Sequence, residues 1–578
     1  MTDERELMRD ALKRSMGDAS FAEVRSQLES RVRSHDLVEV ESRSPSHTFT
    51  TEEMIGYERD NIAYMRNGQN QHEPMVSSET WREVEGKHAH LSGSQRAAVE
   101  QIVSNQDQII GLEGVAGAGK TTSLTAVREA AEQEGYEVRG LAPTSRAAHK
   151  LAESGIETET LQRHLRRAEQ PDGGQKRLYV LDESSLASTK QMNEFLHRLH
   201  GEDRVLLVGD KRQHEAVEAG RPYHQLQQAG MQTARLDEIM RQKDPALKEA
   251  VEQLARGDVF GAIDNLDQQG RVHEIVGREN RFSEIAREYV RQPQGTLVIS
   301  PDNESRRELN GLIHREMQQR GKVSEDEHKL RVLDSRQDMT GADRKWAAQY
   351  EEGDVVRYTR GSKVLGIEPG EYARVMQVDS RENRVTVERE NGERQTYDPR
   401  RLAGVAVYHE NERAFSEGDR VQFTAPSKDL HVANRELGTI EKVNDAGNVQ
   451  IRLDSGREVA FSIREHPHLD HGYAVTSHSS QGQTAERVLI HVDTEKGEQL
   501  VNNRMAYVSV SRGQYDAQIY TNNRSELARD LSRDVSQSTA IGQEMDPAVQ
   551  RIEPGAAQQE AHRPEHDQAH SIGHGIAM

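Results

Sequence analysis

The sequence predicts an α/β protein with two lobes built on parallel sheets, small β-barrels inserted in the second lobe, and a helical N-terminal extension. Apolar runs alternate with helix-like stretches between residues 90 and 240, a pattern that builds a parallel sheet. A second strand of this kind begins at residue 295. Between that strand and residue 473 lies a repeated pattern of alternating strands, which is typical of small barrels.

Composition restricts the class of protein. The 578 residues suffice for three or four domains at roughly 150 residues each. The absence of cysteine excludes disulfides, thiolate zinc sites and cysteine nucleophiles. No apolar run approaches the ~20 residues that span a bilayer, and the start lacks a secretory segment, so we expect a cytoplasmic chain without membrane insertion. The net charge of -21 argues against a nucleic-acid partner only modestly, because local basic segments such as residues 163–167 can line a basic channel.

Residues 1–85 form the predicted helical extension. Residues 50–53, Thr-Thr-Glu-Glu, have the pattern of a capping box, apolar positions follow, and Asn67-Gly68 supplies the stop. Nothing in this segment indicates chemistry.

We expect lobe 1 to be continuous in the sequence and lobe 2 to be interrupted by an insertion. Lobe 1 covers residues 86–240, with predicted strands at 108–112, 137–141, 178–181 and 205–208. The first part of lobe 2 covers residues 241–345 and its last part covers residues 471–531. The β-barrel insertions at 346–470 lie between these parts. The polar, proline-containing stretch 532–578 is expected to be a disordered tail.

The insertions contain an internal repeat. Gly353-Asp354 and the residues that follow match Gly418-Asp419 and their successors at a separation of 65 residues, and each copy continues into alternating strands. We predict two small barrels of about 50 to 60 residues each. Gripping a nucleic-acid strand and serving as a spacer fit this pattern equally well.

A complete phosphate loop of the form G-x-x-x-x-G-K-T follows the first predicted strand and precedes a helix-like stretch at 122–133. In such a loop, backbone N–H groups surround the phosphates, Lys120 reaches the β and γ phosphates, and the Thr121 hydroxyl ligates Mg²⁺. The cofactors expected are therefore ATP and Mg²⁺. The predicted nucleotide-binding residues of the loop are Gly114, Val115, Ala116, Gly117, Ala118, Gly119, Lys120, Thr121 and Thr122.

Two carboxylates follow the apolar run at 178–181. Asp182 suits the Mg²⁺ position, and Glu183 can orient or deprotonate the attacking water. At the end of a further strand, Gln213 is placed to sense the γ-phosphate. These side chains turn a nucleotide-binding site into a hydrolase.

The ordered motifs over residues 85–525 resemble those of superfamily 1 helicases, in particular the RecD-like branch and the helicase portion of TraI/TrwC-type conjugative relaxase-helicases. The resemblance implies two RecA-like lobes with SH3-like barrels. It also implies that Gln95 contacts the adenine base, that Arg241 contacts the γ-phosphate and that Arg512 is the arginine finger. The nucleic-acid contacts that it implies are Thr144, Ser145, Thr476 and His478.

The sequence departs from a full relaxase-helicase. Nothing before Leu91 offers the histidine cluster and nucleophilic tyrosine of a nicking domain, so no nicking activity is expected in this chain. The segment from Thr160 to Leu178 is compatible with a short hairpin that splits duplex in RecD-like enzymes, or with a plain surface hairpin.

The resulting hypothesis is an ATP-dependent helicase that moves on single-stranded DNA, with 5′ to 3′ polarity and a role in conjugative plasmid transfer implied by the resemblance. Conjugation or DNA-processing proteins would be its partners. Two alternatives remain open: a nucleotide-switched nucleic-acid-binding scaffold that does not unwind, and an RNA-directed helicase, which would recognise the 2′-hydroxyl.

Overall fold

Lobe 1 is a parallel sheet of six strands in the order β6-β5-β7-β8-β4-β9. The computed structural model describes residues 2–15, 19–40, 47–167, 174–214, 220–336, 339–497 and 499–535. The strands are β4 (Ile109–Gly114), β5 (Glu137–Ala142), β6 (Glu157–Thr160), β7 (Arg177–Leu181), β8 (Arg204–Gly209) and β9 (Thr233–Leu236). The helices are α5 (Gly93–Val103), α6 (Lys120–Gln133), α7 (Ser145–Ala152), α8 (Leu161–Arg166), α9 (Thr189–Leu196) and α10 (Pro222–Gln228). The central strand β8 is buried along its whole length, as parallel strands covered on both faces require.

Lobe 2 is a second parallel sheet, in the order β10-β25-β24-β11-β23. Its strands are β10 (Val272–Glu274), β11 (Thr296–Ser300), β23 (Ala474–Thr476), β24 (Ala485–Val492) and β25 (Gly513–Thr521). Its helices are α11 (Pro245–Arg256), α12 (Val259–Gln268), α13 (Arg278–Arg291), α14 (Asn303–Gln319), α15 (Ser477–Ser480), α16 (Asn503–Val510) and α17 (Arg524–Leu531). The chain leaves this sheet after α14 and returns at β23, which confirms the predicted class of two parallel-sheet lobes with an insertion in the second.

The insertion holds two antiparallel sheets, each around its own apolar core. We call residues 353–408 insert 1 and residues 418–471 insert 2. The first sheet has the order β12-β17-β13-β14-β15-β16, and the second has the order β21-β20-β19-β18-β22. The strands of the first sheet are β12 (His328–Ser335), β13 (Val355–Tyr358), β14 (Tyr372–Asp379), β15 (Arg384–Arg389), β16 (Arg394–Tyr397) and β17 (Val405–Phe415). The strands of the second are β18 (Arg420–Phe423), β19 (Leu437–Val443), β20 (Asn448–Leu453), β21 (Glu458–Ser462) and β22 (Leu469–His471).

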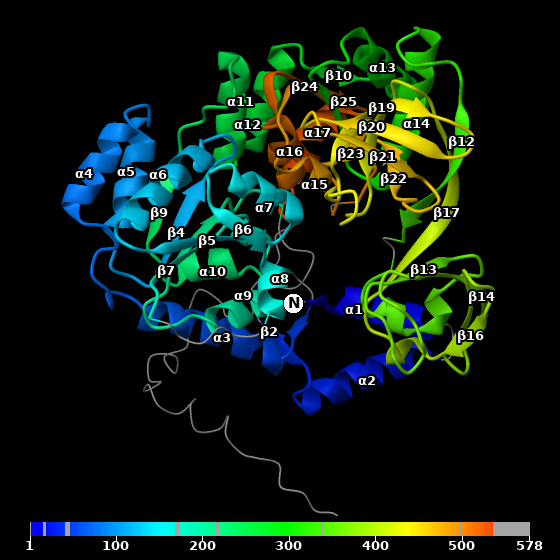
Figure 1. Cartoon of the computed structure of the whole chain (residues 1–578), viewed down its shortest axis with the longest axis horizontal. Helices are drawn as coiled ribbons and strands as arrows, with labels where there is room; N and C mark the ends of the chain where they lie inside the picture. The colour runs from blue at the N-terminus through cyan, green and yellow to red at the C-terminus, as the bar shows by residue number, and fades with distance from the viewer. Residues whose placement is uncertain are drawn as a thin grey trace, which may run out of the picture. The chain divides into compact units, whose positions relative to one another are not determined.

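The internal repeat of the sequence is also a repeat of the structure, including an irregularity in strand pairing. A register shift between Val375 and Gln377 in insert 1 recurs between Ile440 and Lys442 in insert 2, again 65 positions later. The two inserts are joined by the long β12–β17 ribbon, in which β17 pairs with β13 at one end and with β12 at the other (Figure 1). Phe415, at the end of β17, is buried in the core of insert 2.

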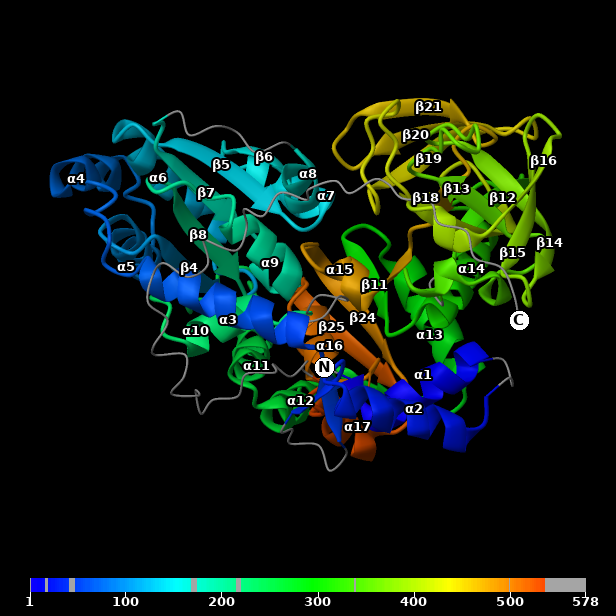
Figure 2. The same cartoon turned by 90° about the horizontal axis from the view of Figure 1, so that it is seen from below.

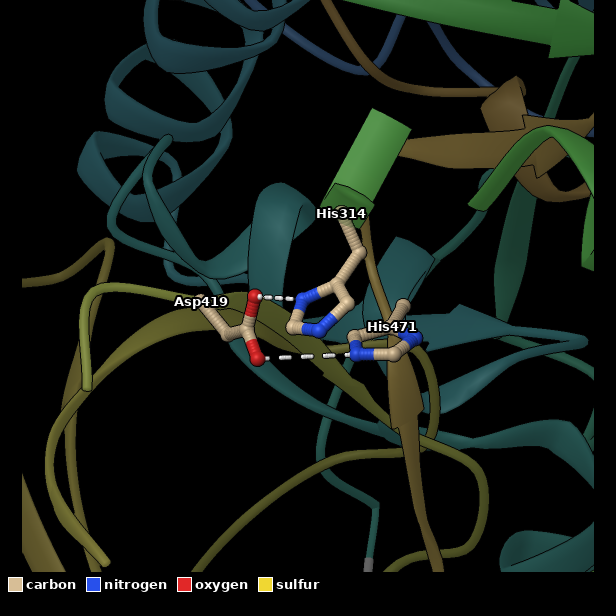
Figure 3. Close-up of side chains that lie close together, drawn as sticks. All are labelled: His314, Asp419 and His471. Atoms are coloured by element: carbon tan, nitrogen blue, oxygen red, sulfur yellow. Dashed lines mark hydrogen bonds and ion pairs between the residues drawn. The ribbon is translucent and has the colours of Figure 1, made fainter. Parts of the chain in front are cut away.

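A buried charge network ties insert 2 to lobe 2 (Figure 3). Asp419 accepts hydrogen bonds from the Ser416 backbone at 2.7 Å and from the Tyr473 hydroxyl at 2.5 Å, and its carboxylate lies 2.7 Å from Nδ1 of His314 in α14 and 3.5 Å from Nε2 of His471. These neighbours hold the pKa of Asp419 far below its usual range, although burial opposes them. Burial alone would lower the pKa of His314, but the carboxylates of Asp419 and Glu327 raise it.

Asp354 is the counterpart of Asp419 in insert 1. It accepts a hydrogen bond from the Glu351 backbone and lies 2.9 Å from the Arg336 guanidinium. Arginine cannot ligate a metal, so the shared feature of the two positions is a buried carboxylate neutralised by a cation. We therefore interpret the His314, Asp419 and His471 cluster as an anchor rather than as a metal site.

The N-terminal region contains helices and, in addition, a small antiparallel sheet in the order β1-β3-β2. Its elements are β1 (Thr2–Asp3), α1 (Glu4–Ser15), α2 (Phe21–Arg33), β2 (Val38–Val40), β3 (Thr48–Thr50), α3 (Glu52–Asn67) and α4 (Ser78–Lys87). The predicted capping box at 50–53 is wrong, because Thr50 ends β3 and the cap is Thr51, whose side chain accepts from the Met54 N–H. Helix α3 lies alongside α9 and α10 of lobe 1 (Figure 2). There Asn61 donates to the Thr189 carbonyl at 3.2 Å.

Two further predictions concern segments that lie partly or wholly outside the described residues. The expected hairpin at 160–178 is wrong where the structure describes it, because β6 pairs in parallel with β5 and residues 161–166 form α8; the tip at 168–173 lies outside the described residues. The expected disordered tail also lies outside them from residue 536 onward. No helix among the described residues is long and apolar enough to cross a membrane.

Candidate active site

The phosphate loop joins β4 to α6 and depends on two glycines. Gly117 and Gly119 have positive φ angles of 83° and 76°, which a side chain rarely adopts. A Cβ atom at Gly117 would lie 2.4 Å from Cβ of Arg241, and one at Gly119 would lie 2.2 Å from Nε2 of Gln95. The glycines therefore permit both the loop conformation and the close approach of two other predicted site residues.

A cavity of about 340 Å³ opens beside this loop, between the two lobes. Its volume falls in the range of roughly 300–1,000 Å³ that is usual for small-molecule sites. Lys120 lies at its floor and donates to the Gly114 carbonyl at 2.6 Å. The lining comprises Ala116, Gly117, Ala118, Gly119, Lys120, Thr121, Leu124, Lys150, Leu151, Asp182, Glu183, Ser185, Gly209, Asp210, Gln213, Met240, Arg241, Gln481, Gly482, Thr484, Arg512 and Gln514. The structure thus brings together the predicted catalytic residues from both lobes.

Two adjacent carboxylates follow β7 and face this cavity. Burial raises the pKa of Asp182, and burial together with the Asp182 charge raises the pKa of Glu183 to about 7. Glu183 has a positive φ of 49°, unusual for a residue with a side chain, and its N–H donates to Oδ1 of Asp182 at 2.8 Å. A carboxyl with a pKa near neutrality, held in a strained turn, is suited to act as a general base.

Four cations, Lys120, Lys150, Arg241 and Arg512, converge on the same cavity. Burial, followed by the charges of Arg241, Arg512 and Lys120, lowers the pKa of Lys150 to about 8. Burial and Arg241 lower the pKa of Arg512 to about 9. The nearby carboxylates are too few to neutralise this cluster, so an anion with several negative charges would relieve the repulsion. Lys150 was not predicted as a site residue; its position one helical turn after Arg146 in α7 was the only available signal.

The arginines are held by backbone carbonyls of lobe 2. Nη1 of Arg241 donates to the Ser511 carbonyl at 2.9 Å, and Nε of Arg512 donates to the Val508 carbonyl at 2.9 Å. Arg241 itself lies in the connection between the lobes, after β9 and before α11. Its neighbour Met240 donates through its N–H to the Gly117 carbonyl at 3.0 Å. The connection therefore touches the phosphate loop of lobe 1 and the end of α16 in lobe 2.

Tyr507 of α16 bridges the lobes and was missed as a site residue. Its hydroxyl accepts from the Ala116 N–H at 2.7 Å and donates to Oδ2 of Asp210 at 2.9 Å. Gln213 donates to the same Asp210 oxygen at 2.8 Å, and Arg504 donates to the Gln213 carbonyl. The phosphate loop, the predicted γ-phosphate sensor and α16 thus form one hydrogen-bonded network. The tyrosine stands five residues before Arg512 in the same motif, but its hydrogen-bond partners lie too far away in the sequence for a motif to reveal them.

Gln95, predicted to contact adenine, lies against the phosphate loop. Its Nε2 donates to the Ala118 carbonyl at 3.3 Å, and its Oε1 accepts from the Ser92 N–H at 3.0 Å in a capping box at the start of α5. This position is next to the nucleotide cavity, and the base contact stays a prediction.

The predicted nucleic-acid residues follow two strands at their carboxyl ends. Thr144 caps α7 after β5, with Ser145 as the first helical residue, and Thr476, the last residue of β23, caps α15. His478 stacks on His214 of lobe 1 with ring centroids 3.7 Å apart. The two segments meet across the lobes where Arg146 donates to the Ser479 carbonyl at 3.3 Å.

A larger hollow of about 1,180 Å³ lies beside these segments, and we call it the interlobe channel. It is bounded by α7 of lobe 1, by lobe 2 around β11, and by insert 2. Its basic lining residues are Arg146, His149, Lys150, Lys322, Arg420 and Arg435. Lys150 and Gly482 line both the nucleotide cavity and the channel, so the two hollows share a wall.

Comparisons with known proteins agree with this arrangement. A family model described as an AAA domain matches residues 90–277. The chain is 26% identical over 515 residues to the multifunctional conjugation protein TraI of Escherichia coli, covering 78% of this chain and 28% of TraI. It is 28% identical over 477 residues to the conjugal transfer protein TraA of Agrobacterium fabrum, covering 79% of this chain and 35% of TraA. It is 32% identical over 195 residues to the ATP-dependent RecD2 DNA helicase of Deinococcus radiodurans, covering 32% of this chain and 26% of RecD2. The chain thus spans about a third or less of these relatives.

Proposed function

We propose that this chain, a RecD-like superfamily 1 relative of the TraI conjugation proteins, is an ATP-driven helicase that moves along single-stranded DNA in conjugative plasmid transfer, with 5′ to 3′ polarity. The observation that carries the proposal is the cavity between the lobes. In it the phosphate loop, two carboxylates and four mutually repelling cations face one another. A Mg²⁺-bound triphosphate matches this arrangement in charge and in donor chemistry.

The residues of the cavity would have separate roles in ATP hydrolysis. Thr121 and Asp182 would hold Mg²⁺, which neutralises charge on the β and γ phosphates when it is bound. Glu183 takes a proton from the attacking water, because its pKa of about 7 leaves much of it ionised at neutral pH. Lys120, Arg241 and Arg512 stabilise the negative charge that develops on the transferred phosphoryl group.

Nucleotide binding would also close the lobes. Lys120 belongs to lobe 1 and Arg512 to lobe 2, so a triphosphate held by both is a cross-link that disappears after hydrolysis. The interlobe channel lies against the same wall, and Arg146 already contacts the segment that contains His478. Opening and closing of the cavity would therefore shift the channel walls relative to each other, as a motor requires.

The testing experiment compares ATP hydrolysis with and without single-stranded DNA for the wild-type chain, Glu183→Gln and the exposed control Glu202→Gln. The same samples are then assayed for unwinding of duplexes that carry a 5′ or a 3′ tail. We expect hydrolysis stimulated by DNA, loss in Glu183→Gln alone, and opening of the 5′-tailed duplex. Hydrolysis that ignores DNA, without unwinding, would support the nucleotide-switched scaffold instead. Equal or stronger stimulation by single-stranded RNA would support an RNA-directed enzyme.

A further inference from the structure

The two inserts differ at two positions where the repeated backbone demands a left-handed conformation. In insert 1 these positions are Gly366 and Gly370, with φ angles of 61° and 95°. Sixty-five residues later, insert 2 has His431 and Arg435, with φ angles of 53° and 67°. Glycine adopts this conformation without steric cost, whereas histidine and arginine are strained in it.

The backbone around these positions is the same in both inserts. The Gly370 N–H donates to the Tyr358 carbonyl at 2.6 Å, and the Arg435 N–H donates to the equivalent Phe423 carbonyl at 2.7 Å. An isolated bridge closes the loop in each copy, between Ser362 and Ile367 and between Ser427 and Val432. The fold of insert 2 therefore has no evident need for side chains at 431 and 435, and strain that persists in such a place points to function.

Arg435 projects into the interlobe channel. It lines this hollow together with Arg146 and Lys150 of lobe 1. Among the described residues, its guanidinium has no hydrogen bond or ion pair with the chain. It is exposed to the hollow, yet partial burial lowers its pKa against the opposing effect of the Glu183 charge. An unpaired guanidinium in a partly desolvated channel is a strong partner for a phosphate group, to which it can donate two parallel hydrogen bonds.

His431 provides the contrast. It is also strained and exposed, but it does not line the channel, and its carbonyl accepts from Arg457 at 2.7 Å. Gly370 of insert 1 has open space where its Cβ would lie, so an arginine would fit there sterically. Of the four repeat positions, Gly366, Gly370, His431 and Arg435, only Arg435 lines the channel.

We propose that Arg435 binds a backbone phosphate of the single strand, and that insert 2 grips the strand while insert 1 makes no such contact. This inference rests on the proposed function, because it assumes that a nucleic-acid strand runs through the interlobe channel. It gives the two halves of the repeat different roles, and it accounts for a strained arginine in insert 2 at the position where insert 1 has glycine.

The test is equilibrium binding of a fluorescent oligothymidylate to the full chain over a range of salt concentrations. Arg435→Gly restores the residue of insert 1 and relieves strain, so the variant should fold and melt at or above the wild-type temperature. We expect about tenfold weaker binding, the usual weight of a charged hydrogen bond. We also expect the slope of log K against log salt to become shallower by about 0.7, the value for one phosphate on a single strand.

Two matched variants complete the test. His431→Gly relieves the same kind of strain away from the channel and should leave affinity and salt slope unchanged. Gly370→Arg adds the arginine to insert 1 and should lower stability without raising affinity. If Arg435→Gly keeps the wild-type affinity and salt slope, the inference is overturned but the proposed function is not. An equal loss of affinity in His431→Gly would also overturn the inference. A wild-type chain that does not bind the oligonucleotide would overturn both the inference and the proposed function.

Discussion

The Tyr507 hydroxyl accepts a hydrogen bond from the Ala116 N–H at 2.7 Å, although the two residues are 391 positions apart. One end of this bond is the phosphate loop of lobe 1, and the other is helix α16 of lobe 2. The same hydroxyl donates to Asp210, so a single buried atom couples the loop, the carboxylate beside Gln213 and the second lobe.

Tyr507→Phe removes both hydrogen bonds and leaves a buried N–H and a buried carboxylate oxygen without this partner. Each loss costs about 1–3 kcal/mol, so we expect a lower melting temperature. We also expect a higher KM for ATP with weaker stimulation by single-stranded DNA. Steady-state hydrolysis and thermal unfolding measure these effects, with the exposed Tyr515→Phe as control. Unchanged stimulation by DNA in Tyr507→Phe would show that the bridge does not couple the lobes.

Gly117→Ala should abolish nucleotide binding. The new Cβ would lie 2.4 Å from that of Arg241, so either the loop or the interlobe connection must move. Gly135→Ala is a matched control, because Gly135 has a similar φ of 82° but open space around its Cβ. Both variants incur left-handed strain of about 1–2 kcal/mol, but only the first should lose affinity for a fluorescent ATP analogue. Equal affinities in the two variants would contradict the proposed role of the close contact.

Hydrolysis should depend on pH through Glu183. The base acts in its ionised form and its pKa is about 7, so kcat/KM is expected to rise as the pH increases through 7 and then to level off. The profile is measured at saturating Mg²⁺ over a pH range in which the protein stays folded. A flat profile between pH 6 and 8 would show that another group limits the reaction.

Glu183→Gln should also stabilise the nucleotide-free protein at alkaline pH. The folded-state pKa of Glu183 is raised, so the wild-type carboxyl favours folding below its ordinary pKa of 4.5 and loses that contribution as the pH rises through about 7. The glutamine variant does not ionise, and its advantage should grow over this window to at most roughly 3 kcal/mol. Denaturant unfolding at pH 5 and pH 8 measures the difference. An advantage of equal size at both pH values would argue against ionisation as its cause.

Asp419→Asn should loosen insert 2 from lobe 2. The substitution removes the carboxylate charge that lies 2.7 Å from buried His314 and leaves Glu327 at 3.3 Å, so the loss should be at most the roughly 3–5 kcal/mol of a broken buried ion pair. Because the partner raises the pKa of His314, the advantage of wild type over the variant should shrink as the pH rises through that raised pKa. Hydrogen exchange over residues 418–471 localises the effect, and Asp354→Asn, which should act on insert 1, is the matched control. Loosening of both inserts by either variant would contradict separate anchors.

The sequence by itself determined the parallel strands, the phosphate loop and the repeat, because each depends on local pattern: continuous apolar runs, glycines at fixed spacing, and a separation of 65 residues. It failed where a local pattern has two outcomes. Thr50 and Thr51 are both able to cap a helix, and the pairing of Thr50 with Val38 in the small N-terminal sheet decided between them. The stretch after Thr160 similarly became α8.

The tertiary structure alone decided which residues, far apart in the sequence, line the same cavity or channel. Lys150 joins the cations of the nucleotide cavity, Tyr507 reaches Ala116, and Arg435 enters the channel, because the folding of two sheets and an insert places them there. The pKa of Glu183 likewise depends on burial and on neighbouring charges rather than on its motif. Motifs specify which chemical groups are present, whereas long-range packing sets their distances and solvation, and these determine what the groups can do.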